Sequence, residues 1–287
     1  GKEGEFFQGP AVVFNDEFKV EEYINQARLS NVTNKDQPIS LYFHIPFCDT
    51  LCFFCACNKI ATKKRDKADK YLDYLEKEMA ILSKLYDQNR IVEQMHFGGG
   101  TPTFLTDSQF QRMMALIAKY FTLIDTEKRD YSIEIDPRSV TKQSIEKLAS
   151  YGFNRFSLGV QDVNPVVQKA VNRIQPTEMT RDIISACRSV GARSISVDLI
   201  YGLPFQTLAS FAKTVDAVIE MSPDRLSVFN YAHMPHLFSP QKRINSEDLP
   251  KPEEKLKILQ MSIEKLTQAG YVYIGMIILQ NLTMSWL

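Results

Sequence analysis

The chain has 287 residues, a length that suits one large domain or two small ones. Its 34 basic and 34 acidic residues balance, which argues against the broad positive surface of a nucleic-acid-binding protein. No apolar stretch reaches the roughly 18 residues of a membrane span, and residues 1–10 lack the pattern of a secretion signal, so we expect a cytoplasmic protein.

Apolar runs rich in β-branched and aromatic residues recur along the chain, and amphipathic stretches separate them. The predicted strands are residues 40–47, 94–100, 131–136, 153–160, 194–202 and 225–232. The predicted helices are residues 16–29, 66–87, 107–122, 141–150, 177–190, 207–220 and 251–269. This alternation indicates an α/β fold with a parallel sheet. Six units favour a partial (β/α)6 barrel, with an open doubly wound sheet as the alternative.

Local signals mark the ends of several predicted helices. Residues typical of helix starts are Thr106, Thr141 and Pro176. Glycines placed as C-terminal stops are Gly152, Gly191 and Gly270.

Three cysteines on the loop after the first strand form a Cys-x3-Cys-x2-Cys pattern at Cys48, Cys52 and Cys55, and Cys57 follows. Thiolates clustered this tightly usually hold a metal or a cluster. The spacing fits neither a zinc finger nor a two-cluster ferredoxin. Three thiolates on a four-iron cluster leave one iron open, which indicates chemistry rather than scaffolding. The alternatives are a structural zinc site and a disulfide cluster, the latter typical of small secreted chains.

Polar residues and glycines gather where the predicted strands end, as functional residues do in parallel β/α folds. The glycines of HFGGGTPT (96–103) would let a ligand approach the backbone and would leave amides free to bind a polar group. A tight turn is the alternative. Glu134 and Asp136 are two residues apart on a strand and therefore share a face, with a solvated strand end as the alternative.

Single residues add to this pattern. Asp198 lies inside an apolar run, where a charge needs a partner or a ligand. Arg173 suits a carboxylate clamp, or else is an ordinary surface arginine. Tyr42 and His44 share a face just before the cysteines and are either core residues or functional ones. Cys187, within a predicted helix, is expected to be an inert buried thiol.

The cysteine motif resembles that of the radical S-adenosylmethionine (SAM) superfamily, in which the open iron chelates SAM and the reduced cluster splits it to a 5′-deoxyadenosyl radical. Within that superfamily the chain resembles the oxygen-independent coproporphyrinogen III oxidases (coproporphyrinogen dehydrogenases). The resemblance covers most of residues 38–276 and is specific because the motif extends to Cys57. It rests on residues 41–59, 96–105, 133–138, 157–173, 197–207 and 222–235.

The resemblance implies a [4Fe–4S] cluster bound by Cys48, Cys52 and Cys55, with Cys57 close by but not a ligand, and two SAM molecules. The implied contacts of the cluster-bound SAM are Tyr42, Gly99 and Glu134. The implied contacts of the second SAM are Phe54, Gly100, Thr101, Gln161, Arg173, Asp198 and Ala232. We expect catalytic roles for Tyr42, His44 and Glu134.

The implied reaction turns two propionates of coproporphyrinogen III into vinyl groups and gives protoporphyrinogen IX in anaerobic haem synthesis. The resemblance also implies an electron-donor protein as partner, and we expect a monomer. The expected organisation is an N-terminal extension (1–37), a core barrel (38–276) and an atypical tail (277–287). The family's C-terminal domain is expected to be missing, which predicts a barrel that binds cluster and SAM but has weak or absent turnover. The rival hypotheses are a haem-binding chaperone of the superfamily, a haem-degrading methyl-transferring enzyme and an inactive truncated fragment.

Overall fold

A computed structural model describes residues 18–275 and 278–281. Within these residues, nine strands form one sheet, and six of them form a continuous parallel run that begins at one edge. The parallel strands are, in spatial order, β1 (Ile39–Ile45), β4 (Ile91–Gly99), β6 (Asp130–Ile135), β7 (Arg155–Gln161), β8 (Ser194–Tyr201) and β9 (Arg225–Asn230). These are the six strands predicted from the sequence, and the prediction is confirmed.

One helix or a pair of helices follows each of the six parallel strands. These helices are α2 (Lys67–Leu82), α3 (Asp107–Tyr120), α4 (Lys142–Ser150), α5 (Pro165–Ala170), α6 (Thr177–Ser189), α7 (Leu208–Met221) and α8 (Pro252–Gln268). All were predicted except the single-turn α5, which has proline in its first turn and Asn164 as its N-cap. The predicted starts at Thr106 and Thr141 are capping boxes, and the three predicted glycine stops have positive φ angles.

The N-terminal helix α1 (Val20–Thr33) runs four residues past the predicted end at residue 29. Tertiary contacts explain the extension, because Asn31 Nδ2 donates to Leu85 O and Ser30 Oγ accepts from Arg90 Nη1. These contacts keep polar residues within the helix, although local propensity alone would place them at its end. Residues 16 and 17 of the predicted helix lie outside the described residues.

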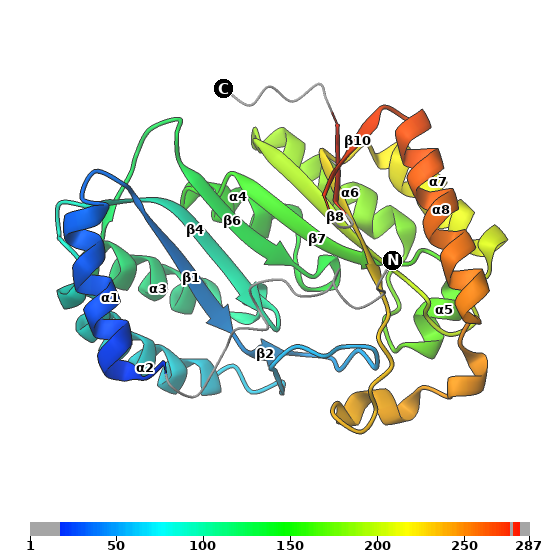
Figure 1. Cartoon of the computed structure of the whole chain (residues 1–287), viewed down its shortest axis with the longest axis horizontal. Helices are drawn as coiled ribbons and strands as arrows, with labels where there is room; N and C mark the ends of the chain where they lie inside the picture. The colour runs from blue at the N-terminus through cyan, green and yellow to red at the C-terminus, as the bar shows by residue number, and fades with distance from the viewer. Residues whose placement is uncertain (1–17, 276–277, 282–287) are drawn as a thin grey trace, which may run out of the picture.

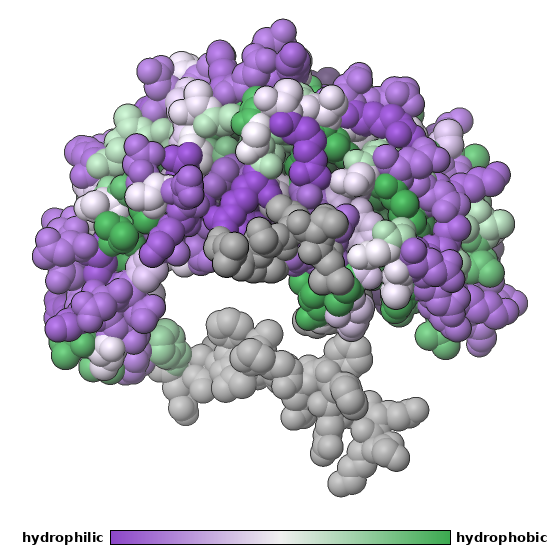
Figure 2. Space-filling view, turned by 90° about the horizontal axis from the view of Figure 1, so that it is seen from above, coloured by the Kyte–Doolittle hydropathy of each residue, from purple (hydrophilic) through white to green (hydrophobic). Residues whose placement is uncertain are grey.

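The sheet is a partial barrel rather than a doubly wound sheet. Along β6 and β7 buried side chains alternate with partly exposed ones, so helices cover one face of the sheet only, whereas a doubly wound sheet is covered on both. Figure 1 shows the helices following the outside of the curved sheet, and Figure 2 shows the arched body around an open concave side. The (β/α)6 prediction is therefore confirmed.

The far edge of the sheet is a hairpin that the sequence did not predict. Strand β11 (Ile278–Asn281) pairs antiparallel with β9, and β10 (Tyr271–Gly275) pairs antiparallel with β11. The short strand β5 (Thr122–Leu123) pairs with β4. The described part of the predicted tail thus belongs to the same sheet as the core, while the proposed boundary after Met276 falls outside the described residues.

The main hydrophobic core lies between the convex face of the sheet and the helices. Phe97 on β4 packs against Phe110 of α3, with ring centroids 5.6 Å apart, and against Phe153 before β7, at 5.2 Å. Cys187 is fully buried here, and burial raises the pKa of its thiol to about 12, as expected of an inert cysteine. None of the described helices is both long and apolar enough to cross a bilayer.

Candidate active site

The cysteine loop is closed at its base by two short parallel strands, β2 (Phe47–Cys48) and β3 (Ile60–Ala61). Ile60 N donates to Pro46 O over 2.6 Å, and Thr62 N donates to Cys48 O over 2.9 Å. Residues 49–59 therefore leave the sheet and return to it at one point. This closure fixes both ends of the segment that carries the cysteines.

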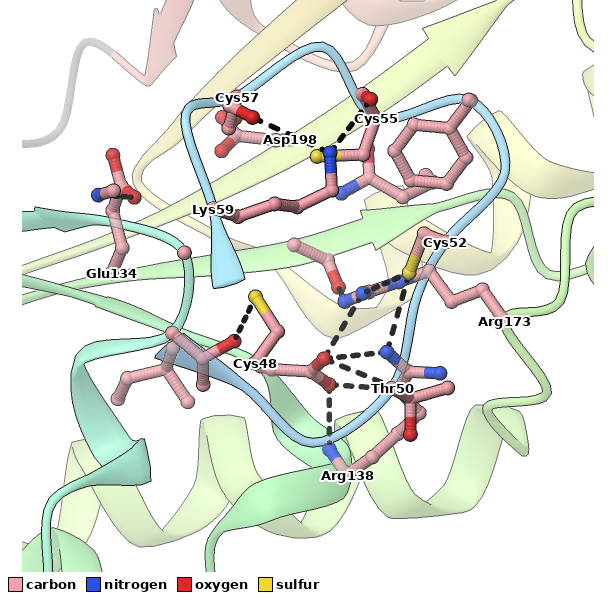
Figure 3. A pocket seen from close by; sticks show the side chains of 18 of the residues that line it. Cys48, Thr50, Cys52, Cys55, Cys57, Lys59, Glu134, Arg138, Arg173 and Asp198 are labelled. Carbon is pink, nitrogen blue, oxygen red and sulfur yellow. Dashed lines mark hydrogen bonds and ion pairs between the residues drawn. The ribbon is translucent and has the colours of Figure 1, made fainter. Parts of the chain in front are cut away.

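A pocket of about 270 Å³ lies between this loop and the carboxyl ends of the parallel strands (Figure 3). All four cysteines of the loop line it. The other predicted site residues that line it are Phe54, Gly99, Gly100, Thr101, Glu134, Gln161, Arg173 and Asp198. Residues from the cysteine loop, from the ends of four parallel strands and from the chain after the fifth helix therefore meet where functional sites of parallel β/α folds lie.

Tyr42, His44 and Ala232 do not line this pocket. Tyr42 Oη lies 3.0 Å from His44 Nδ1, and His44 Nε2 lies 2.8 Å from Asn58 O, so His44 connects β1 to the cysteine loop. Tyr42 also stacks on His96, whose Nε2 is 3.4 Å from Glu134 Oε1. Tyr42 and His44 therefore lie beside the pocket and contact the residues next to its wall.

The glycine-rich segment at the end of β4 brings two backbones into close contact. A Cβ atom on Gly100 would lie 2.8 Å from the Pro46 backbone and 2.9 Å from Cys48 Sγ. The expectation of free amides is wrong, because Gly99 N donates to Glu134 Oε2, Gly100 N to Ile45 O and Thr101 N to a backbone carbonyl of β2. Gly100 allows the close approach to the base of the cysteine loop, whereas added Cβ atoms on Gly98 and Gly99 would meet side chains such as Tyr42 and His44.

We expect Gly100→Ala to destabilise the fold by about 1–3 kcal/mol, because the added methyl group meets backbone atoms that cannot rotate away. Thiol alkylation at Cys48 should also become faster, since the loop base must move. Gly191→Ala meets no atom within 4 Å but strains the backbone at its φ of 75°, so it serves as a destabilised control that should leave the alkylation rate of Cys48 unchanged. Urea unfolding and an alkylation time course measure both effects; wild-type values for Gly100→Ala would contradict the expectation.

Two guanidinium groups converge on Cys52 and on one carboxylate (Figure 3). Arg138 Nη2 lies 3.4 Å and Arg173 Nη1 3.6 Å from Cys52 Sγ. The same nitrogens lie 2.6 Å and 3.1 Å from Asp136 Oδ2. Burial works to raise the pKa of Asp136, but the two arginines outweigh it and hold the pKa below its ordinary value. Arg173 is only 6% exposed, so it is not an ordinary surface arginine.

The other thiols of the loop differ in their surroundings. Burial raises the pKa of Cys48, although Thr101 Oγ1 lies within hydrogen-bond distance of its sulfur at 3.5 Å. A hydrogen bond with Cys57 lowers the pKa of Cys55 to about 6. The same hydrogen bond, together with partial burial, raises the pKa of Cys57. Lys59 Nζ donates to the Cys55 carbonyl over 2.9 Å. Cys55 is thus the thiolate of its pair and Cys57 the donor.

Asp198 of β8 is a half-buried carboxyl group in the pocket wall. Burial raises its pKa to about 6, and the nearby charge of Glu134 adds to the shift. Hydrogen bonds with Ser227 and Ser157 oppose it, the latter over 3.5 Å. A carboxylate kept in such a place costs stability, which is the pattern expected of a residue that serves a ligand.

We expect Asp198→Asn to raise the free energy of unfolding at pH 7 by about 1–3 kcal/mol. The folded carboxyl holds its proton up to about pH 6, whereas an unfolded one loses it near 3.9, so wild-type stability falls as pH rises between these values. The gain should therefore vanish below about pH 4. Urea unfolding across pH checks this, with the exposed Asp182→Asn as control; an equal gain at all pH values would contradict it.

Comparison with known proteins identifies the fold and the motif. Residues 42–218 match the family model of the radical SAM superfamily. The chain belongs to the radical SAM superfamily. It is 54% identical over 239 residues to the oxygen-independent coproporphyrinogen III oxidase of Pseudomonas aeruginosa, an alignment that covers 83% of this chain and 52% of that protein.

Two further comparisons agree with this placement within the radical SAM superfamily. The oxygen-independent coproporphyrinogen III oxidase of Escherichia coli is 48% identical over 257 residues, covering 89% of this chain and 56% of that protein. The solved structure of coproporphyrinogen III oxidase (HemN) from Escherichia coli, a radical SAM enzyme, superposes with a TM-score of 0.88 at 46% identity, covering 94% of this chain and 61% of that one. The chain spans about half the length of the curated relatives it matches.

Membership in the radical SAM superfamily implies a [4Fe–4S] cluster and SAM as cofactors. The residues present fit such a group, because three thiols line one pocket and the buried Gln161 Oε1 there has no partner among the described residues. Among residues 18–275 and 278–281, no three His, Cys, Asp or Glu side chains stand close enough to share a single metal ion. A cluster needs no such convergence, because several irons separate the thiolates.

Sequence reasoning missed three residues of the site. Arg138 stands two residues after Asp136, in the short 3₁₀ helix η4 (Pro137–Ser139) that follows β6, and opposite charges at this spacing could have suggested the pair. Lys59 follows the cysteines closely, so a cation beside clustered thiolates was also a usable signal. Gln241 lies in a polar stretch after β9, residues 240–255, and no local pattern indicates its burial.

Proposed function

We propose that the chain carries out the oxygen-independent oxidation of coproporphyrinogen III to protoporphyrinogen IX. The observation that carries the proposal is the pocket, in which the residues implied by the resemblance meet at the carboxyl ends of the strands. The 54% identity to an oxygen-independent coproporphyrinogen III oxidase supports the choice of substrate. The similar curated proteins bear oxidase names, which favours this function over that of a haem-binding chaperone.

Cys48, Cys52 and Cys55 would hold the cluster, and Cys57 would stay a neighbour. The cluster and SAM together would supply the chemistry that removes a hydrogen atom from the β-carbon of a propionate. Each propionate would then lose CO2 and pass one electron to an external electron acceptor, which leaves a vinyl group. The role of the protein would be to bind and orient the reactants and to keep water away from them.

We infer that the wall residues divide between two SAM molecules. Gly99 and Glu134 stand at the ends of β4 and β6 and would contact the cluster-bound molecule, with Tyr42 beside them. The residues assigned to the second molecule are Phe54, Gly100, Thr101, Gln161, Arg173, Asp198 and Ala232. Several of these come from β7, β8 and the chain after them, farther along the sheet. This separation along the sheet supports two subsites.

We further propose catalytic roles for Tyr42, His44 and Glu134. Tyr42 and Glu134 both contact His96, and His44 contacts the cysteine loop at Asn58 O, so all three are linked to the pocket wall. An electron-donor protein would supply the reducing electrons. A monomer in the cytoplasm is the expected state, because a reducing compartment preserves free thiolates and iron–sulfur clusters.

Anaerobic reconstitution with iron and sulfide, followed by reduction with SAM and coproporphyrinogen III, tests the proposal. Formation of 5′-deoxyadenosine and CO2 together supports it. Formation of 5′-deoxyadenosine without CO2 would reject this substrate while keeping the radical chemistry. Neither product from a protein with a full cluster, together with tight haem binding, would point to a haem-binding role. Omission of SAM is the control.

A further inference from the structure

The chain after β9 returns to the cysteine loop. Residues 231–238 lead into the short 3₁₀ helix η5 (Ser239–Arg243), which the sequence presents as part of a polar run. Gln241 in this helix is nevertheless only 1% exposed. A buried amide is costly unless its donors and acceptor are satisfied, so its contacts show what it is placed to do.

The side chain of Gln241 joins two parts of the candidate site. Its Nε2 donates to Phe54 O over 3.0 Å and to Ala232 O over 3.2 Å. Its Oε1 accepts a hydrogen bond from Met234 N over 2.6 Å. Both amide hydrogens and the carbonyl are therefore engaged, and this set of partners fixes the orientation of the amide. Phe54 immediately precedes Cys55 in the loop.

Apolar packing also holds the cysteine loop against the chain around η5. A second buried cluster, separate from the main core, lies beneath the cysteine loop with Phe53 and Phe54 packed against it. It consists of Val167, Val171, Leu203, Tyr231 and Ile244. The guanidinium of Arg243 lies 5.0 Å from the Phe53 ring centroid, and Phe53 N donates to Val171 O over 2.9 Å. The loop is thus held between the end of α5 and η5.

We propose that Gln241 is a positioning residue that fixes the cysteine loop at Phe54 and Cys55 relative to the segment 232–234. The backbone of the loop at Cys55 and the Ala232 carbonyl are then set by one rigid amide rather than by two independent loops. The consequence for a cluster and for SAM rests on the proposed function. The placement of the backbone does not, because the contacts exist in the chain alone.

Hydrogen exchange of the chain without a cluster tests the placement directly. In the wild-type protein the Met234 amide should exchange at least about tenfold more slowly than that of His233, although both lie outside regular secondary structure. This measurement needs no variant, so it stands even if a substitution prevents folding. Equal exchange rates at Met234 and His233 would overturn the proposal.

Two variants of Gln241 extend the test. Gln241→Glu puts a carboxylate against two carbonyl oxygens, and Gln241→Met keeps the volume but loses all three hydrogen bonds. Either should speed exchange in peptides covering 50–58 and 232–238 by roughly tenfold, with β7 and β8 unchanged. Gln268→Glu, at an exposed glutamine near the end of α8, is the matched control and should change neither peptide. A folded Gln241 variant with wild-type exchange in both peptides would overturn the proposal.

A spectroscopic readout separates positioning from general stability. After reconstitution, the variants should retain iron yet give an altered electron paramagnetic resonance signal on addition of SAM, although the loss of buried hydrogen bonds lowers their unfolding midpoint below that of Gln268→Glu. A wild-type signal alongside loosened loop exchange would show that the amide does not position the cofactors and would overturn that part of the proposal. Failure of the wild-type chain to bind a cluster would reject the proposed function and leave the exchange result standing.

Discussion

Alanine at Cys48, Cys52 or Cys55 is expected to abolish cluster binding and, with it, SAM cleavage. Each of these thiols lines the pocket. Three thiolates on a four-iron cluster leave one iron open for SAM, so the loss of any one removes a needed ligand. The loss should far exceed the roughly 10–100-fold effect of removing a residue that only supports a ligand. Iron and sulfide content per chain after anaerobic reconstitution, followed by 5′-deoxyadenosine formation, measures it.

Cys57→Ala and Cys187→Ala are the matched controls within the same chain. Cys57 is exposed at the loop surface and acts as the hydrogen-bond donor to Cys55, whereas Cys187 is buried in α6, away from the pocket. Both variants should retain iron, and only Cys57→Ala should change the signal of the reduced cluster. Iron loss in Cys57→Ala with iron retention in Cys55→Ala would show that the ligand set is wrong.

The sheet could be predicted from the sequence because its pattern is local. Along β6 the residues Tyr131, Ile133 and Ile135 are buried, and Ser132 and Glu134 between them face the concave side, as period-two alternation requires. The same rule correctly placed Glu134 and Asp136 in one pocket wall. The rule says nothing of their partners, and they differ: Glu134 accepts from a glycine amide, whereas Asp136 binds two arginines.

What the sequence could not give is set by contacts between distant segments. Arg173 meets Asp136 across 37 positions, and Gln241 meets Phe54 across 187. No local pattern encodes such pairs, since the same residues would be exposed in isolated strands or turns. The prediction of free glycine amides was wrong for the same reason. The acceptors of these amides lie on β1, β2 and β6 and are brought into place only when the strands pair. The prediction that the amides of HFGGGTPT are free to bind a ligand assumed that they face solvent. In the fold they donate to oxygen atoms of neighbouring strands.

Asp136→Ala is expected to lower the free energy of unfolding at pH 7 by about 3–5 kcal/mol, because it leaves the buried guanidiniums of Arg138 and Arg173 without their carboxylate. The exposed pair of Asp73 with Arg112 is the control, and Asp73→Ala should cost about 0–1 kcal/mol. Urea unfolding of the protein without a cluster measures both. Equal costs for the two variants would show that the charge network at Cys52 does not depend on Asp136.

The pH dependence of this cost has a definite sign. The arginines hold the pKa of folded Asp136 below that of an unfolded aspartate, which is about 3.9. The unfolded chain therefore takes up the proton first as the pH falls, and the stabilisation is present in full above about pH 4 and is lost as the pH drops through the folded pKa. The difference between wild type and Asp136→Ala should then shrink in acid. A difference that stays constant down to the acid transition would mean that Asp136 contributes by shape and not by charge, and that the arginines at Cys52 are held by other groups.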